Sequence, residues 1–143
     1  MQDIRWKQRY SSYREMLNVL DRNLQYEVSE STEEIVHMAL AKNLEFCFEL
    51  MWKLLKDYLQ HNDVEIGLIS PKNVLKTAAN SGLLEQMDVD GDVLMHIHET
   101  RNKLVHTYNQ EKMQDILKGL KETFFPEMIK VDDYFRKLAS SDE

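Results

Sequence analysis

Apolar and polar positions along this chain repeat with the period of helices. Within residues 4–26 the apolar side chains recur in steps of three and four and form one stripe, made of Trp6, Tyr10, Tyr13, Leu17, Leu20 and Leu24. Such a stripe is typical of a helix that packs on a core, and we interpret it as core. No segment shows the two-residue alternation of a strand.

A second, longer helix is predicted to follow and to end near residue 60. Ser31 and Glu34 have the spacing of a capping box, in which the Ser31 hydroxyl accepts from the Glu34 amide. Residues 44–55 are apolar around most of the circumference, which predicts the centre of a bundle or a helix shared between two subunits. Glu45 and Glu49 lie one turn apart there, and we interpret them as a solvated or salt-bridged edge rather than a paired-carboxylate site.

Turn residues divide the remainder of the chain. Ser70 followed by Pro71 predicts the start of a short helix, which Gly82 stops. The acidic residues 88–92 resemble the start of a calcium loop but lack its later ligands, so we expect a turn with helix-capping acids.

Two more helices are expected after that turn. The first covers about residues 92–107, and the last covers about residues 110–138 and is kinked or divided by Pro126. Its core face is made of Met113, Ile116, Leu117, Leu120 and Phe124. The pattern as a whole predicts an all-α fold, an antiparallel up-and-down bundle of four to five helices.

Composition fits this architecture. The chain has 143 residues with only four Gly and two Pro, which suits one helical domain over residues 1–143 with a frayed tail at 139–143. No apolar run approaches the length of a membrane span, and the N-terminus has no signal-peptide core. The lone Cys47 excludes an internal disulfide and a Cys-rich zinc site. We therefore expect a cytoplasmic protein that makes no membrane contact.

Charge limits the choice of partners. The formal net charge is −7, whereas general nucleic-acid binders are usually basic because phosphate neutralisation supplies most of their affinity. Any nucleic-acid chemistry must use a local cationic pocket, or a partner must present the substrate.

Residues 99–109 bring together the side chains that suit phosphate chemistry. On a helix, Arg101 and Tyr108 fall about 20° apart on one face, and Asn102 and His106 share a neighbouring face. Arg101 and His106 stand about 140° apart, so they can meet on one substrate only if the helix end distorts or a second copy contributes its own set. Arg can hold a phosphate through two parallel hydrogen bonds, His can move protons near neutral pH, and Tyr offers a hydroxyl.

A simpler interpretation competes with this one. A His and an Arg near a helix C-terminus can cap free carbonyls and interact with the helix dipole, for about 0.3–1 kcal/mol. His96 and His98 lie two apart, so a helix directs them to different faces, which argues against a shared metal. No Gly-rich phosphate loop or His-Glu-x-x-His pattern is present, and we expect no metal and no cofactor.

The pattern Arg101-x4-His106-x-Tyr108 resembles the motif of the HEPN superfamily of helical nucleotide-binding domains. Other segments resemble its nucleotidyltransferase substrate-binding branch, namely residues 5–10, 44–53, 70–72 and 101–109. Arg-x4-His alone is a weak pattern, but the whole set in this order is specific and covers nearly the full chain.

The resemblance implies a small helical bundle that forms a homodimer and binds a minimal nucleotidyltransferase encoded nearby. In related toxin–antitoxin pairs the helical subunit is a metal-independent ribonuclease, which the nucleotidyltransferase silences by adding AMP to the motif tyrosine. Carried over by position, Arg101 and His106 are catalytic, Asn102 is supporting and Tyr108 is the modification site. Leu104-Val105 depart from the family pattern, where many members have small polar residues.

Three hypotheses follow. The first is a ribonuclease in which Arg101 clamps the scissile phosphate and His106 assists attack by the 2′-hydroxyl or protonates the leaving oxygen. The alternative is a non-catalytic subunit that binds a nucleotide or another substrate for the nucleotidyltransferase. The third, a purely structural helical dimer, leaves the Arg101, His106 and Tyr108 pattern unexplained. Net acidity favours the second hypothesis over the first, whereas the retained Arg–His pair favours the first.

Overall fold

The computed structural model describes residues 4–106 and 109–141, and every regular element in them is helical. The elements in chain order are α1 (Arg5–Leu24), α2 (Glu33–His61), α3 (Pro71–Asn80), α4 (Leu83–Met87), α5 (Gly91–His106), α6 (Gln110–Gly119), a π-helical turn (Leu120–Phe124) and α7 (Phe125–Ser141). The all-α prediction is therefore confirmed.

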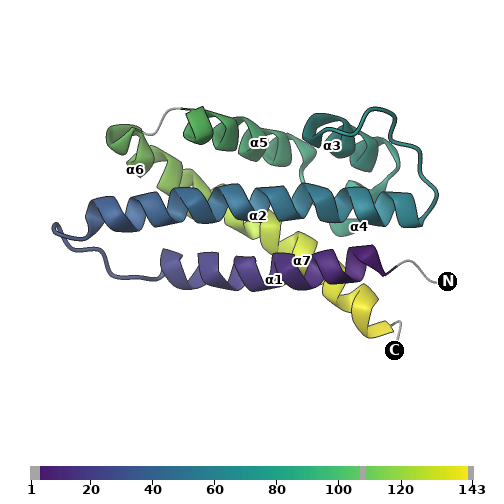
Figure 1. Ribbon diagram of the computed structural model, residues 1–143, viewed down its shortest axis with the longest axis horizontal. Helices are drawn as coiled ribbons and strands as arrows, with labels where there is room; N and C mark the ends of the chain where they lie inside the picture. The colour runs from purple at the N-terminus through teal and green to yellow at the C-terminus, as the bar shows by residue number, and fades with distance from the viewer. Residues whose placement is uncertain (1–3, 107–108, 142–143) are drawn as a thin grey trace.

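The long helix α2 is the centre of the arrangement (Figure 1). Helix α1 lies antiparallel along one side of α2, α3 and α5 lie along another side, and the α6–α7 arm crosses both long helices diagonally and packs on them. The apolar segment 44–55 is covered within a single chain, with full burial of Leu44, Cys47, Phe48, Met51, Leu54 and Leu55. Within one chain this segment therefore occupies the centre of the helices, which is one of the two positions that the sequence predicts for it.

Helix α1 joins the bundle through its predicted stripe. Trp6, Tyr10, Tyr13, Leu17 and Leu20 are all buried, and Leu24 is partly buried at the helix end. The Tyr13 hydroxyl donates to the Met128 carbonyl at 2.7 Å, and the Tyr10 hydroxyl donates to Asp132 at 2.9 Å. Both bonds connect α1 to α7, the last helix of the chain.

The predicted capping box at Ser31 is wrong. Helix α2 begins one residue later than a Ser31 cap requires, with Thr32 as the N-cap residue and no side-chain cap bond. The hydroxyls of this turn bond to one another instead, since the Ser29 hydroxyl lies 3.1 Å from the Ser31 hydroxyl and 2.9 Å from the Thr32 hydroxyl. Local side-chain bonds of this kind compete with helix capping.

Turn residues bound the short helices α3 and α4. Ser70 accepts from the Asn73 amide at 3.2 Å and Pro71 is the first residue of α3, both as predicted. Helix α4 was not predicted, since five residues are too few to show a helical period. Gly82 and Asp88, which flank α4, both have positive φ, and left-handed residues of this kind end helices.

Pro126 divides the last helix as expected. Proline has no N–H to donate within the helix, and its ring crowds the preceding turn. The chain meets this constraint with the wider π-helical turn directly before α7. Helix α7 then continues to Ser141, past the expected end at residue 138. Within residues 4–106 and 109–141, no helix is long and apolar enough to cross a membrane.

Candidate functional site

Arg101, Asn102 and His106 lie in the last two turns of α5. The Asp90 carboxylate caps the start of this helix by accepting from the Asp92 amide at 2.9 Å. Leu94, Ile97 and Thr100 are buried and fix the rotation of α5 against α2 and α3. This rotation places Arg101 beside α2.

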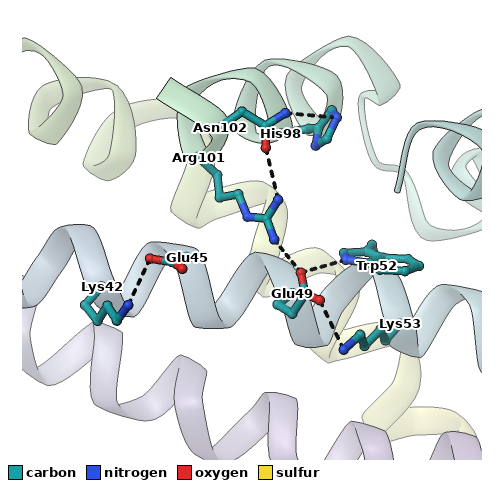
Figure 2. A network of polar contacts seen from close by, with 8 residues as sticks. All are labelled: Lys42, Glu45, Glu49, Trp52, Lys53, His98, Arg101 and Asn102. Carbon is teal, nitrogen blue, oxygen red and sulfur yellow. Dashed lines mark hydrogen bonds and ion pairs between the residues drawn. The ribbon is translucent and has the colours of Figure 1, made fainter. Parts of the chain in front are cut away.

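Arg101 is held by a carboxylate from α2 (Figure 2). Its Nη2 donates to Glu49 Oε2 at 2.5 Å, and its Nη1 donates to Asn102 Oδ1 at 3.0 Å. The guanidinium carbon lies 5.7 Å from the centre of the Phe48 ring, in cation–π range. The Arg101 side chain is 20% exposed, so its charge is paired and largely covered.

Glu49 has two further partners on its own helix. Trp52 Nε1 donates to Oε2 at 3.0 Å, and Lys53 Nζ lies 3.0 Å from Oε1. Burial by itself would raise the pKa of the Glu49 carboxyl, but the bonds from Trp52 and Lys53 and the charges of Lys53 and Arg101 lower it overall. Glu49 is therefore an ionised carboxylate at neutral pH. The interpretation of Glu45 and Glu49 as a salt-bridged edge is confirmed, since Glu45 pairs with Lys42 at 3.4 Å.

His98 completes this network on the other side of Arg101. Its Nε2 lies 3.4 Å from Asn102 Nδ2, and its ring stacks on Phe48 with 5.4 Å between the centroids. Asn102 Oδ1 already accepts from Arg101, so the Asn102 amide group is the donor to His98 and the Nε2 atom accepts. Burial, and then the charge of Arg101, lower the pKa of His98, which favours this neutral form.

His106 lies apart from this network, in what we call the α5–α6 groove. The groove has a volume of about 440 Å³ and is lined by Asn102, Lys103, Leu104, His106, Asn109, Lys112 and Ile116. Asn109 caps α6 by accepting from the amides of Glu111 and Lys112, which brings the start of α6 to the end of α5.

The structure thus keeps Arg101 and His106 apart, although both belong to the sequence motif. Helix α5 stays regular through His106, so the distortion that would unite Arg101 and His106 does not occur. Arg101 faces Glu49, His106 faces the groove, and Asn102 contacts both places. Tyr108 lies outside the described residues.

Two site residues were not singled out by sequence reasoning. Glu49 approaches Arg101 across 52 residues of sequence, and nothing in the pattern distinguishes it from Glu45. His98 was considered only as a metal ligand with His96. As predicted, the two rings diverge, because His96 packs edge-on against Phe124 while His98 stacks on Phe48. In the described part of the chain, no group of three His, Cys, Asp or Glu side chains is placed to hold a metal.

Comparison with known proteins adds one finding. A protein-family model described as "Nucleotidyltransferase substrate binding protein like" matches residues 8–137, which include α5, the start of α6 and nearly all of the bundle. A search among curated proteins finds no match.

Proposed function

The chain belongs to the nucleotidyltransferase substrate binding protein-like family, and from this premise we propose that it holds a phosphate-bearing substrate in the α5–α6 groove for a separate nucleotidyltransferase. The family implies the nucleotidyltransferase partner. The substrate class and its place on the chain are our proposal.

The lining of the α5–α6 groove carries this proposal. Its described residues include two lysines, Lys103 and Lys112, together with His106 and two asparagines, and no carboxylate. On a chain of net charge −7 this is a local cationic pocket of the kind that anion binding requires. The side chains of Leu104 and Ile116 add apolar surface suited to a base or ribose.

Calorimetry with AMP and ATP tests this function. The double variant Lys103→Gln/Lys112→Gln should weaken nucleotide binding about tenfold or more, since each hydrogen bond to a charged group contributes about 1.5–3 kcal/mol. The control is Lys76→Gln, which removes an exposed lysine on α3 outside the groove. Equal affinities of the double variant and the control would refute the groove as the binding site.

A second candidate is the metal-independent ribonuclease. Arg101 and His106 face different surfaces of one chain, so this activity requires a homodimer in which Arg101 of one copy meets His106 of the other. Exposed apolar side chains beside the motif favour such a contact: Met38 on α2 is 53% exposed and Val105 on α5 is 49% exposed, and both line a hollow between the two helices. Sedimentation should show a dimer that Met38→Glu dissociates, and a wild-type monomer at micromolar concentration would contradict it.

Mixing inactive variants tests the shared active site directly. Arg101→Ala and His106→Ala should each reduce RNA cleavage in EDTA by about 10²–10⁴-fold with unchanged helical circular dichroism. A mixed dimer of the two variants keeps one intact Arg101–His106 pair across the interface, so equal mixing should restore about a quarter of the wild-type rate. Absence of recovery in a mixture that exchanges subunits would exclude an active site shared in this way. His61→Ala, which changes the last residue of α2, is the control.

The resemblance also supports regulation by AMP addition at Tyr108. In this step the tyrosine oxygen forms a bond to the α-phosphorus of ATP, pyrophosphate leaves, and the phenolic proton is lost. Incubation with the cognate nucleotidyltransferase, ATP and magnesium should add one adenylate, which peptide mapping assigns to Tyr108. Tyr108→Phe should block the addition, whereas Tyr26→Phe, which removes a tyrosine that is 57% exposed, should not. An adenylate that persists on Tyr108→Phe would refute the assignment.

A further inference from the structure

We propose that Glu49 is a positioning residue that withholds Arg101 from anionic ligands, and that the Glu49–Arg101 ion pair opens when Arg101 takes up a phosphate. The inference rests on the proposed function in one respect, that the ligand near α5 carries phosphate. It concerns a residue on α2 that belongs neither to the motif nor to the α5–α6 groove.

The ion pair holds Arg101 through one nitrogen of its guanidinium (Figure 2). Arg101 meets Glu49 through Nη2 alone, and Nη1 is used by Asn102. The buried Nε of Arg101 has no hydrogen-bond partner among the described residues. The contact with Glu49 is therefore a single hydrogen bond rather than the two-pronged bond that guanidinium groups form with carboxylates and phosphates. A phosphate that engages two guanidinium nitrogens can replace it.

Neither Glu49 nor Arg101 is left without a partner when the pair opens. Glu49 keeps the hydrogen bond from Trp52 and the ion pair with Lys53. Arg101 keeps the Phe48 ring beneath it and the amide oxygen of Asn102 beside it. A buried ion pair without such second partners would lock the arginine in place, because opening it leaves an uncompensated charge.

The guanidinium of Arg101 lies close to the α5–α6 groove. Asn102 contacts Arg101 and also lines the α5–α6 groove, so the guanidinium lies one hydrogen bond from the groove. A phosphate bound at the Asn102 end of the groove can therefore compete with Glu49 for the guanidinium while Arg101 stays on the Phe48 ring.

The size of the effect follows from exposure. The side chains of Arg101 and Glu49 are 20% and 32% exposed, so solvent partly screens the pair. Ion pairs in such settings contribute about 0.2–1 kcal/mol, which corresponds to a change in affinity of up to about fivefold. Glu49 thus adjusts how strongly Arg101 engages an anion without abolishing the contact.

Chemical modification tests the ion pair without any ligand. Phenylglyoxal reacts with accessible guanidinium groups, and mass spectrometry of the Arg101 peptide measures the rate. Glu49→Gln keeps the shape of the side chain and an acceptor for Trp52 but removes the charge, so the Arg101 rate should rise about two- to fivefold. The matched control is Glu45→Gln, which removes the same charge one turn earlier, where it pairs with Lys42. Equal rates in the two variants would overturn the proposal.

Phosphate binding then tests the consequence for a ligand. With inorganic phosphate and AMP as probes, Glu49→Gln should bind about two- to fivefold more tightly than Glu45→Gln, and adding Arg101→Gln should remove the gain. Weaker binding by Glu49→Gln would mean that Glu49 presents Arg101 to the ligand, which would overturn the proposal.

The two experiments separate this inference from the proposed function. A higher modification rate in Glu49→Gln, combined with no effect of Lys103→Gln/Lys112→Gln on AMP affinity, supports the withheld arginine and refutes the groove. An unchanged modification rate in Glu49→Gln, combined with weaker AMP binding by Lys103→Gln/Lys112→Gln, refutes the inference and leaves the groove as the binding site.

Discussion

Asp57 offers the sharpest test of how this bundle is held together. Its carboxylate is only 2% exposed, and it accepts from Arg9 Nε on α1 at 3.0 Å and pairs with Lys56 Nζ at 3.4 Å. The bond from Arg9 joins α1 to α2, the two longest helices, across 48 residues of sequence. The informative change is Arg9→Met, which keeps most of the apolar stem and removes the guanidinium.

The cost follows from what Asp57 retains. Breaking a fully buried ion pair costs about 3–5 kcal/mol, because a charge is left uncompensated. Here Oδ1 keeps Lys56, and Arg9 is itself 33% exposed, so the loss is closer to that of one unsatisfied buried acceptor, about 1–3 kcal/mol. For a chain of 143 residues this lowers Tm by about 3–10 °C.

An exposed pair of the same length is the control. Arg136 Nη2 lies 2.9 Å from Asp133 Oδ1, and the two side chains are 48% and 43% exposed. Arg136→Met should therefore cost at most about 0.5 kcal/mol. Urea unfolding followed by circular dichroism measures both variants. If Arg9→Met destabilises the fold no more than Arg136→Met does, burial of Asp57 does not set the strength of its pair, and the reasoning is wrong.

Three further predictions use the same unfolding assay. Tyr13→Phe removes the bond to the Met128 carbonyl and should cost about 1 kcal/mol; no loss would contradict its role in joining α1 to α7. Gly82→Ala should cost about 1–2 kcal/mol through its backbone alone, since its φ is +86° and an added Cβ meets nothing within 4 Å; a neutral change would contradict this. Because burial and the charge of Arg101 lower the pKa of His98 below 6.5, the unfolded chain binds the proton first and stability falls as pH drops from about 7.5 to 5.5. The His98→Gln variant should lose less stability over this pH range than the wild type does, and the same pH dependence in both proteins would refute this prediction.

The helices could be predicted because their apolar periods are long. The α1 stripe and the apolar segment of α2 extend over many turns, so each gives a strong signal of burial. Helix α4 has five residues and shows no period, and it is held by the left-handed residues at its two ends. The cap of α2 was mispredicted since three neighbouring hydroxyls can bond one another, a competition that the residue pattern does not resolve.

The site was predictable only where it is local. The angle between Arg101 and His106 follows from helix geometry alone, and the structure keeps them on different surfaces. The contact of Arg101 with Glu49 depends on how α5 is rotated against α2, which buried residues on both helices decide together. Glu45 and Glu49 have equivalent patterns in the sequence, so tertiary packing selects between them.

Packing also changes where a second copy can bind. From the sequence, the apolar circumference of residues 44–55 and the family resemblance together predict a homodimer, but the chain buries most of that apolar surface itself. Phe46 within this segment stays 44% exposed. The exposed apolar side chains beside the motif are Met38 on α2 and Val105 on α5, which line one hollow between the two helices. A dimer built there would bury Val105, the neighbour of His106, and would bring two copies of the motif toward each other. The apolar pair Leu104-Val105 would then serve the interface, and the chemistry would depend on side chains that each copy supplies to the other.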